Sequence, residues 1–156
     1  MENDDIYYMK EALYEADIAY KLDEIPIGAV IVCDNKIVAR GHNVRNTDKN
    51  PLGHAELIAI DWAARYICDW RLEDCTMYVT VEPCPMCAGA IVQSRIKRLV
   101  YGCDNNKAGS CGSILNIVEE SRYNHQVEVT RYVVENECAC MMKSFFKKLR
   151  TVSKEK

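Results

Sequence analysis

The order of short β-branched segments and helical segments constrains the fold of this chain more than any other feature of the sequence. The first 20 residues carry apolar side chains at helical intervals, which predicts a helix that begins at Asp4 or Asp5. Two β-branched runs follow at residues 27–33 and 36–42, and only two residues separate them. We therefore expect a β-hairpin directly after the first helix.

From residue 54 onward, segments of the two kinds alternate. We expect a helix at 54–67 buried on more than one side, a strand at 76–81, a helix at 85–94, a strand at 96–102, a short helix, a strand at 126–132 and a terminal helix from 134. This order predicts an α/β fold of three α/β/α layers, with a mixed five-stranded sheet and helices on both faces. Parallel strands are expected after residue 54, beside the antiparallel hairpin, and such sheets bind ligands at their strand ends.

Length and composition exclude several other classes of protein. The 156 residues suit one domain, with a core of about residues 5–150, and 49% hydrophobic against 28% charged residues argues against disorder. No apolar run approaches the ~20 residues of a membrane span, and the N-terminus lacks the pattern of a signal peptide. Nine cysteines without an export signal indicate a reducing compartment with free thiols, so we expect a cytoplasmic protein without a membrane partner.

The net charge of −3 conceals an asymmetry between the two ends of the chain. Residues 1–24 sum to −6, whereas residues 143–156 sum to +5. A basic helix end is commonly just a solvated helix C-terminus, and charge alone favours that interpretation. The alternative is an anchor for the phosphates of a nucleic acid.

Two short segments, His54-Ala55-Glu56 and Pro83-Cys84-Pro85-Met86-Cys87, carry the residues best suited to chemistry. Two cysteines at C-x-x-C spacing can bind one metal ion from a single turn, and a histidine would make a third ligand. Three protein ligands and one open position are typical of a catalytic zinc. Glu56 can face the same ion as His54 only if the histidine lies at the very start of its helix.

Other interpretations of these segments remain open on spacing alone. The cysteine pair could be redox-active, or it could be half of a structural zinc site. A structural site would need a fourth ligand, for which the spare candidates are His42, Cys75, Cys103 and Cys111.

The ordered pattern H-x-E followed by P-C-x-x-C is a signature of zinc deaminases. The chain resembles the bacterial tRNA adenosine deaminases from about Pro26 to Arg150. The matching segments are IPIGAVIV (25–32), GHN (41–43), HAE (54–56), MYVTVEPCPMCAGAIVQSRI (77–96), GS-x-L-N (112–116), NHQVEV (124–129) and FF-x-x-LR (145–150). The resemblance implies a single zinc-dependent deaminase domain over residues 1–156 with a cytidine-deaminase-like fold. It also implies a homodimer that converts adenosine to inosine at the wobble position of a tRNA anticodon.

The resemblance also implies roles for individual residues. One Zn²⁺ per chain would be held by His54, Cys84 and Cys87, with Glu56 as the catalytic acid and base that moves a water proton to N1 of adenine and then to ammonia. Substrate-binding roles fall on Asn43 and the Ala55 backbone N–H at the base, on Ile25 and Val81 as apolar walls, and on Lys107, Phe146 and Arg150 at the anticodon stem-loop. Ile25 and Val81 are equally well explained as ordinary core residues. Phe145 is expected to pack inside, which favours Phe146 for RNA.

The chain departs from the family pattern at Asn105, where the family usually has an aspartate near the sugar-phosphate of the substrate. An amide there removes a carboxylate acceptor and a repulsive charge, so we expect an effect on substrate range and none on the chemistry. Apart from Cys84 and Cys87, the cysteines are expected to be buried small hydrophobic residues.

The sequence allows two alternatives to tRNA deamination. The first is a free-base or nucleoside deaminase of the same fold, acting on guanine or cytosine, which would not need the basic terminal helix. The second is a non-catalytic zinc subunit of a heterodimeric tRNA deaminase, which would lack the Glu56 carboxylate. The sequence leaves open whether the dimer partner is a second copy or a different chain.

Overall fold

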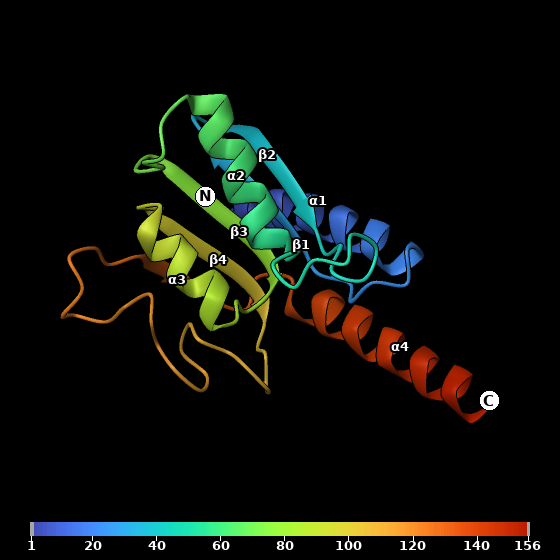
Figure 1. Cartoon of the computed structure of the whole chain (residues 1–156). Helices are drawn as coiled ribbons and strands as arrows, with labels where there is room; N and C mark the ends of the chain where they lie inside the picture. Colours follow the sequence, from blue (N-terminus) through green and yellow to red (C-terminus); the bar gives the residue numbers. More distant parts are fainter. Residues whose placement is uncertain (1, 156) are drawn as a thin grey trace.

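The computed structural model describes residues 2–155, which form one five-stranded sheet covered by four helices (Figure 1). The elements are α1 (Glu2–Lys21), β1 (Gly28–Cys33), β2 (Lys36–His42), α2 (Ala55–Ile67), β3 (Cys75–Val81), α3 (Pro85–Gln93), β4 (Arg98–Cys103), β5 (Glu128–Thr130) and α4 (Glu135–Lys154). The predicted α/β class and the mixed five-stranded sheet are confirmed.

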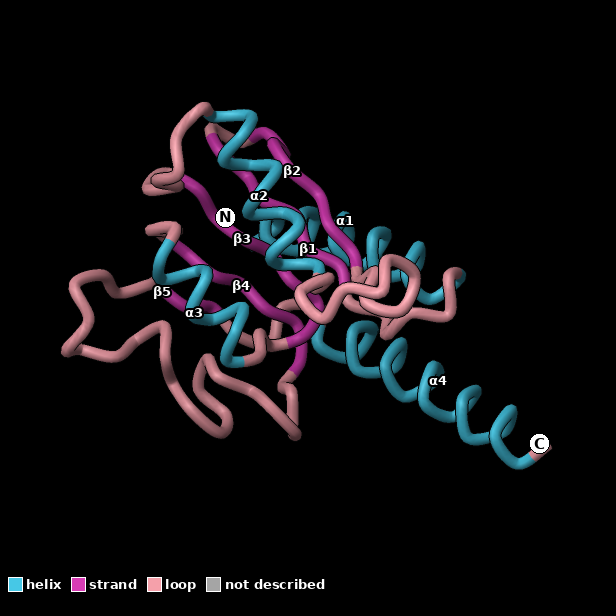
Figure 2. The backbone as a smooth tube through the Cα atoms, viewed as in Figure 1, coloured by secondary structure: helices cyan, strands magenta, loops and turns pink. Residues whose placement is uncertain are grey.

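The strands lie in the order β2-β1-β3-β4-β5. Strand β1 pairs antiparallel with both β2 and β3, whereas β3–β4 and β4–β5 are parallel pairs. Figure 2 shows α2 and α3 lying side by side over one face of this sheet, with α1 on the other face and α4 extending beyond the body of the molecule. The sheet therefore has an antiparallel half from the hairpin and a parallel half from the later β-α units, as predicted.

Each face of the sheet has its own hydrophobic core. The core under α2 and α3 is rich in alanine, so these helices lie close to the strands. Helix α2 approaches β2 closely at Gly41, where a Cβ would lie only 2.3 Å from the Ala55 carbonyl oxygen. The absence of a side chain at Gly41 therefore lets the first turn of α2 rest directly on the end of β2. The core under α1 and α4 contains Met9, Leu13, Tyr78 and Cys138 among others.

The structure differs from several expectations. The first helix begins at Glu2, and β5 is only three residues long. The expected short helix between β4 and β5 is wrong: within the described chain, residues 104–127 form turns and bends with one isolated bridge, Cys111 to Asn116. Among residues 2–155, no helix is long and apolar enough to cross a membrane.

Burial also corrects two expectations about side chains. Helix α2 is buried on one face only, since Trp62 and Tyr66 are 59% and 67% exposed. Not every spare cysteine is a buried hydrophobic residue, because Cys68 and Cys140 are exposed and Cys33 is half-buried. The remaining spare cysteines are buried as expected.

Candidate active site

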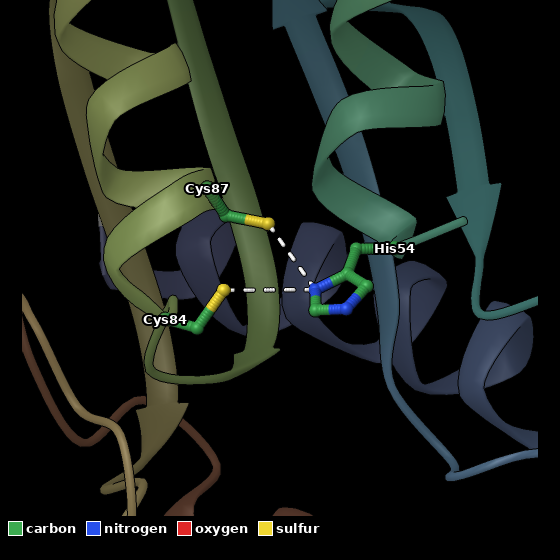
Figure 3. Close-up of side chains that lie close together, drawn as sticks. All are labelled: His54, Cys84 and Cys87. Carbon is green, nitrogen blue, oxygen red and sulfur yellow. Dashed lines mark hydrogen bonds between the residues drawn. The ribbon is translucent and has the colours of Figure 1, made fainter. Parts of the chain in front are cut away.

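The structure brings His54, Cys84 and Cys87 together between the first turns of α2 and α3 (Figure 3). Nδ1 of His54 lies 3.6 Å from Sγ of Cys84 and 3.5 Å from Sγ of Cys87. The ligand atoms of the three residues all lie within 4.8 Å of one another, and the described residues contain no other such group. None of the spare candidates for a fourth ligand belongs to it, so the arrangement is that of a three-ligand site.

Local backbone conformation aims these side chains at one point. His54 and Cys84 are the N-cap residues of α2 and α3, and both have extended backbones, with φ/ψ of −93°/144° and −73°/174°. Pro85 follows at the first helical position, where a missing N–H costs nothing. The expectation that His54 lies at the very start of its helix is confirmed.

The donor set fits a metal that prefers nitrogen and sulfur. A hydrogen bond from the Cys87 thiol, aided by His54, lowers the pKa of Cys84 to about 4, so Cys84 is a thiolate at neutral pH. The same pairing raises the pKa of Cys87, which is also buried. One imidazole and two sulfur ligands are typical of zinc, and zinc would replace the proton that the two sulfurs share. The three residues can thus hold a metal ion.

Glu56 lies in the first turn of α2 and is 3% exposed. Its Oε1 atom is buried and has no hydrogen-bond partner. Burial raises the pKa of Glu56 to about 7. A buried carboxylate with an unused oxygen next to a metal-ligating group is suited to accept and release a proton near neutral pH.

Of the residues expected to bind the base, Asn43 and Ala55 lie directly beside His54. Asn43 is buried, and its Oδ1 accepts a hydrogen bond of 2.9 Å from the Ala55 backbone N–H. The Asn43 amide and the Ala55 N–H, both expected to contact the substrate base, are therefore hydrogen-bonded to each other. Val81 is buried in the core beneath α1 and α4, and Ile25 is half-buried.

The residues expected to contact RNA come together from two parts of the chain. Lys107, in the loop after β4, places its Nζ 5.8 Å from the ring centroid of Phe146 in α4. Phe145 is 2% exposed and packs against Tyr20, so its predicted burial is confirmed, whereas Phe146 is half-buried. Arg150 is exposed one turn further along α4.

Sequence reasoning missed Glu82 and Glu24, two buried carboxylates that fix the loops around the site. Glu82 is 1% exposed and accepts hydrogen bonds from the backbone N–H groups of Asn105, Cys111 and Ser113 and from the Ser113 hydroxyl. Glu24 accepts the Asn46 N–H with both oxygens. The one available signal was a lone acid at the end of the apolar strand TMYVTV, immediately before Pro83.

The position that departs from the family pattern has a local role. The Asn105 Oδ1 accepts the backbone N–H groups of Lys107 and Ala108 at 3.2 and 3.0 Å. It therefore caps the turn that carries Lys107.

The fold and the site together define a deaminase. Residues 2–150 match the family of MafB19-like deaminases. The chain is 48% identical over 150 residues to a tRNA-specific adenosine deaminase of Bacillus subtilis, covering 96% of this chain and 93% of the relative. It is 45% identical over 147 residues to one of Haemophilus influenzae, covering 94% and 85%. The chain therefore belongs to the MafB19-like deaminase family and, within it, to the bacterial tRNA-specific adenosine deaminases.

Solved structures agree with this placement. One from studies of A-to-I editing by tRNA:A34 deaminases superimposes with a TM-score of 0.83 at 37% identity, covering 86% of this chain and 98% of the other. A guanine deaminase of Bacillus subtilis gives a lower TM-score of 0.60 at 39% identity and covers 63% of both chains. The expected deaminase fold is confirmed.

Proposed function

We propose that this protein catalyses the hydrolytic deamination of adenosine to inosine at the wobble position of tRNA anticodons, with one Zn²⁺ per chain held by His54, Cys84 and Cys87. The observation that carries this proposal is Glu56, which is buried beside the three ligands with an unpartnered oxygen and a pKa of about 7. Zinc in such a site lowers the pKa of a bound water to near neutrality. Membership of the tRNA-specific adenosine deaminases supports adenosine in tRNA as the substrate.

In the proposed reaction, Glu56 transfers protons and the other site residues bind the base. Glu56 takes a proton from the attacking water and delivers it to N1 of the adenine, which makes C6 more electrophilic. After attack at C6, Glu56 gives a proton to the departing ammonia. Asn43 and the Ala55 N–H, which bond to each other at 2.9 Å, would separate to meet the base. The half-buried Ile25 would supply an apolar wall of the pocket, whereas the packing of Val81 beneath α1 and α4 supports its interpretation as an ordinary core residue.

Recognition of RNA is assigned to the loop after β4 and to α4. Lys107 lies over the Phe146 ring, which gives a cation next to a stacking surface, and Arg150 adds a second exposed cation on the same helix. Aromatic rings stack on unpaired bases, while cations bind the phosphates that join them. Lys147, the exposed residue after Phe146, adds a further cation to α4. We expect the double variant Phe146→Ala with Lys147→Ala to lower kcat/KM on an anticodon stem-loop and to reduce its salt dependence, while the zinc content stays at one per chain.

A homodimer is the second part of the proposal. Gly89 lies in α3, half-exposed, and a Cβ at this position would meet nothing within 4 Å. A glycine inside a helix costs about 1 kcal/mol relative to alanine, and no neighbour among residues 2–155 requires a glycine at this position. Close approach of a second copy over α2 and α3 would explain its presence. A fully active monomer by light scattering at micromolar concentration would contradict this part.

The decisive experiment compares substrates on the purified chain. An anticodon stem-loop with adenosine at position 34, free adenosine, guanine and cytosine are incubated separately with the enzyme, and the products are identified by mass spectrometry. We expect inosine from the stem-loop. Xanthine from guanine or uracil from cytosine, with no inosine in RNA, would replace the proposal with the free-base deaminase alternative. Metal analysis of Cys87→Ser should show loss of zinc, and a full equivalent would reject the ligand set.

We also propose that the protein acts in the cytoplasm. Its thiolate ligands require reducing conditions, and the proposed substrate is a cytoplasmic RNA.

A further inference from the structure

A second pair of cysteines lies on neighbouring strands, away from the metal-ligating group. Cys33 ends β1, Cys75 begins β3, and the two residues face each other in the antiparallel register. The Cys75 N–H donates to the Leu72 carbonyl at 3.1 Å and not across the strands. This identifies Cys33 and Cys75 as a non-hydrogen-bonded pair, the type in which opposite Cα atoms are about 4.5 Å apart and side chains are closest.

That geometry suits a disulfide. Cα atoms bridged by a disulfide are usually about 4.4–6.8 Å apart, so a non-hydrogen-bonded antiparallel pair falls inside the range without movement of the backbone. Side chains at opposite positions of a pair also point to the same face of the sheet. Both cysteines contribute to the core beneath α2 and α3.

The two thiols differ in how easily they are reached. Cys75 is 1% exposed, whereas Cys33 is half-buried beside the Asp34-Asn35 turn. Burial, together with the neighbouring Cys33 thiol, raises the pKa of Cys75 to about 12. An oxidant therefore meets Cys33 first, and Cys75 is held in place to react second.

The pair is remote from the active site. Cys75 is at the first residue of β3, and the seven-residue strand runs from there to Val81, just before the metal ligands. At about 3.3 Å per residue, the strand separates the two thiol sites by roughly 20 Å. Neither Cys33 nor Cys75 belongs to the metal-ligating group.

We propose that Cys33 and Cys75 form an oxidation site that closes to an intramolecular disulfide on reaction with a low-molecular-weight disulfide such as oxidised glutathione. The Cys33 thiolate attacks the small disulfide, forms a mixed disulfide and releases one small thiol. Cys75 then loses its proton to solvent and attacks Sγ of Cys33, which releases the second small thiol. Two protein thiols are oxidised, one small disulfide is reduced, and no other reagent is needed.

The bond would join β1 to β3 across the segment that carries Asn43, His54 and Glu56. Closing a long loop removes conformational freedom from the unfolded chain and raises the thermal midpoint. For a chain of this size we expect a rise of roughly 5–15 °C on oxidation.

The test uses the full-length, zinc-loaded protein incubated in buffers of increasing ratio of oxidised to reduced glutathione. Free thiols are then alkylated, and the peptides are mapped by mass spectrometry without reduction. We expect a peptide that links Cys33 to Cys75 within one chain, a higher thermal midpoint and unchanged zinc content. The variant Cys33→Ser should lose both the link and the rise in midpoint. Because Cys33 is half-buried, this variant is expected to fold even if Cys75→Ser does not.

The matched control removes the two exposed cysteines. Cys68→Ser with Cys140→Ser should keep the Cys33–Cys75 link, since these residues are outside the pair. A stable mixed disulfide of glutathione on Cys33 that Cys75 never resolves would overturn the proposal. So would glutathionylation confined to Cys68 and Cys140, or links found only between chains.

Discussion

Two buried carboxylates, Glu56 and Glu82, each lie two residues from a metal ligand in the sequence, but they differ in their hydrogen bonds and in the direction of their pKa shifts. Glu56 opens α2 and Glu82 follows β3, and the two are 3% and 1% exposed. Oε1 of Glu56 has no partner, whereas both oxygens of Glu82 accept hydrogen bonds, four in all. Burial raises the pKa of Glu56 to about 7, but for Glu82 the bonds from Ser113 and the backbone outweigh burial and lower the pKa.

The contrast shows that the number of hydrogen-bond donors, and not burial alone, decides whether the pKa of a buried carboxyl group is raised or lowered. A buried charge is costly unless hydrogen bonds replace the water that it loses. Glu82 has these bonds and fixes the loop that carries Asn105. Oε1 of Glu56 has no such bond, and burial outweighs the hydrogen bonds that the carboxyl group does accept, so its pKa rises to about 7. A group of this kind is suited to exchange protons with a substrate.

The largest effect should come from Glu56→Gln. An amide cannot carry a proton between water, N1 of adenine and ammonia, so we expect kcat to fall by about 10²–10⁴-fold. The zinc content and the thermal midpoint should stay near those of the wild type, because the free oxygen of Glu56 makes no hydrogen bond to lose. Single-turnover assays on the anticodon stem-loop measure the rate, metal analysis gives the zinc content, and thermal unfolding gives the midpoint.

Cys87→Ser is the matched control, since it should lose activity together with zinc. Near-normal turnover in Glu56→Gln would reject the catalytic role of this carboxylate. Glu56 and Glu82 would then not differ in function.

For Glu82→Gln we expect the opposite result, a large loss of stability with a small loss of activity. The new amide group would face backbone N–H groups and leave buried donors unpaired, which costs about 2–3 kcal/mol of unfolding free energy. The decrease in kcat per folded molecule should be much smaller than for Glu56→Gln. Urea unfolding of the metal-loaded protein gives the loss in stability, and the exposed Glu73→Gln should stay within about 0.5 kcal/mol of wild type. A variant as stable as wild type would show that the four bonds at Glu82 do not stabilise the fold.

Asp5 extends the comparison to a carboxylate far from the metal ligands. It accepts hydrogen bonds from Arg98 at 2.9 and 2.7 Å and from the Tyr78 hydroxyl at 2.8 Å. Burial alone would raise the pKa of Asp5, but the bonds from Arg98 and Tyr78 outweigh it and lower the pKa below its usual 3.8. The stabilisation is therefore present above pH 3.8 and is lost as the pH falls through the folded-state pKa.

We expect Asp5→Asn to lower the free energy of unfolding by about 1–2 kcal/mol at pH 7, because charge-assisted bonds are replaced by neutral ones. The difference from wild type should shrink as the pH drops below 3.8, where wild-type Asp5 is protonated as well. Denaturant midpoints of both proteins from pH 7 to pH 3 test this, and a difference that grows toward low pH would contradict it.

The same contrast explains what the sequence could predict. His54, Glu56, Cys84 and Cys87 belong to two short motifs in which residues a few positions apart also act together, so local spacing identified them. Glu82 binds groups 23 to 31 residues away. No local sequence pattern indicates partners this far away, so the sequence alone does not predict that Glu82 fixes the loop after β4.

The long helices and strands could also be predicted from local sequence, because hydrophobic periodicity identified each of them. The prediction of a helix between β4 and β5 is wrong, because backbone N–H groups of this segment donate to the Glu82 carboxylate and the Cys111–Asn116 bridge also fixes its conformation. The exposure of Trp62 and Tyr66 on α2 was also missed, because composition does not tell which face of a helix meets the sheet.

The smallest effect on stability is expected at Arg150, which lies outside both the core and the metal site. Its side chain is exposed, and it makes no ion pair within residues 2–155. The C-terminal end of α4 extends beyond the body of the molecule (Figure 1). Arg150→Ala should therefore change the free energy of unfolding by no more than about 0.5 kcal/mol. If Arg150 binds a phosphate of the anticodon arm, its loss should lower the slope of log Kd against log salt concentration by about 0.7–1. Binding of the stem-loop between 50 and 200 mM salt measures that slope, and the same slope in both proteins would assign the basic end of α4 to solvation alone.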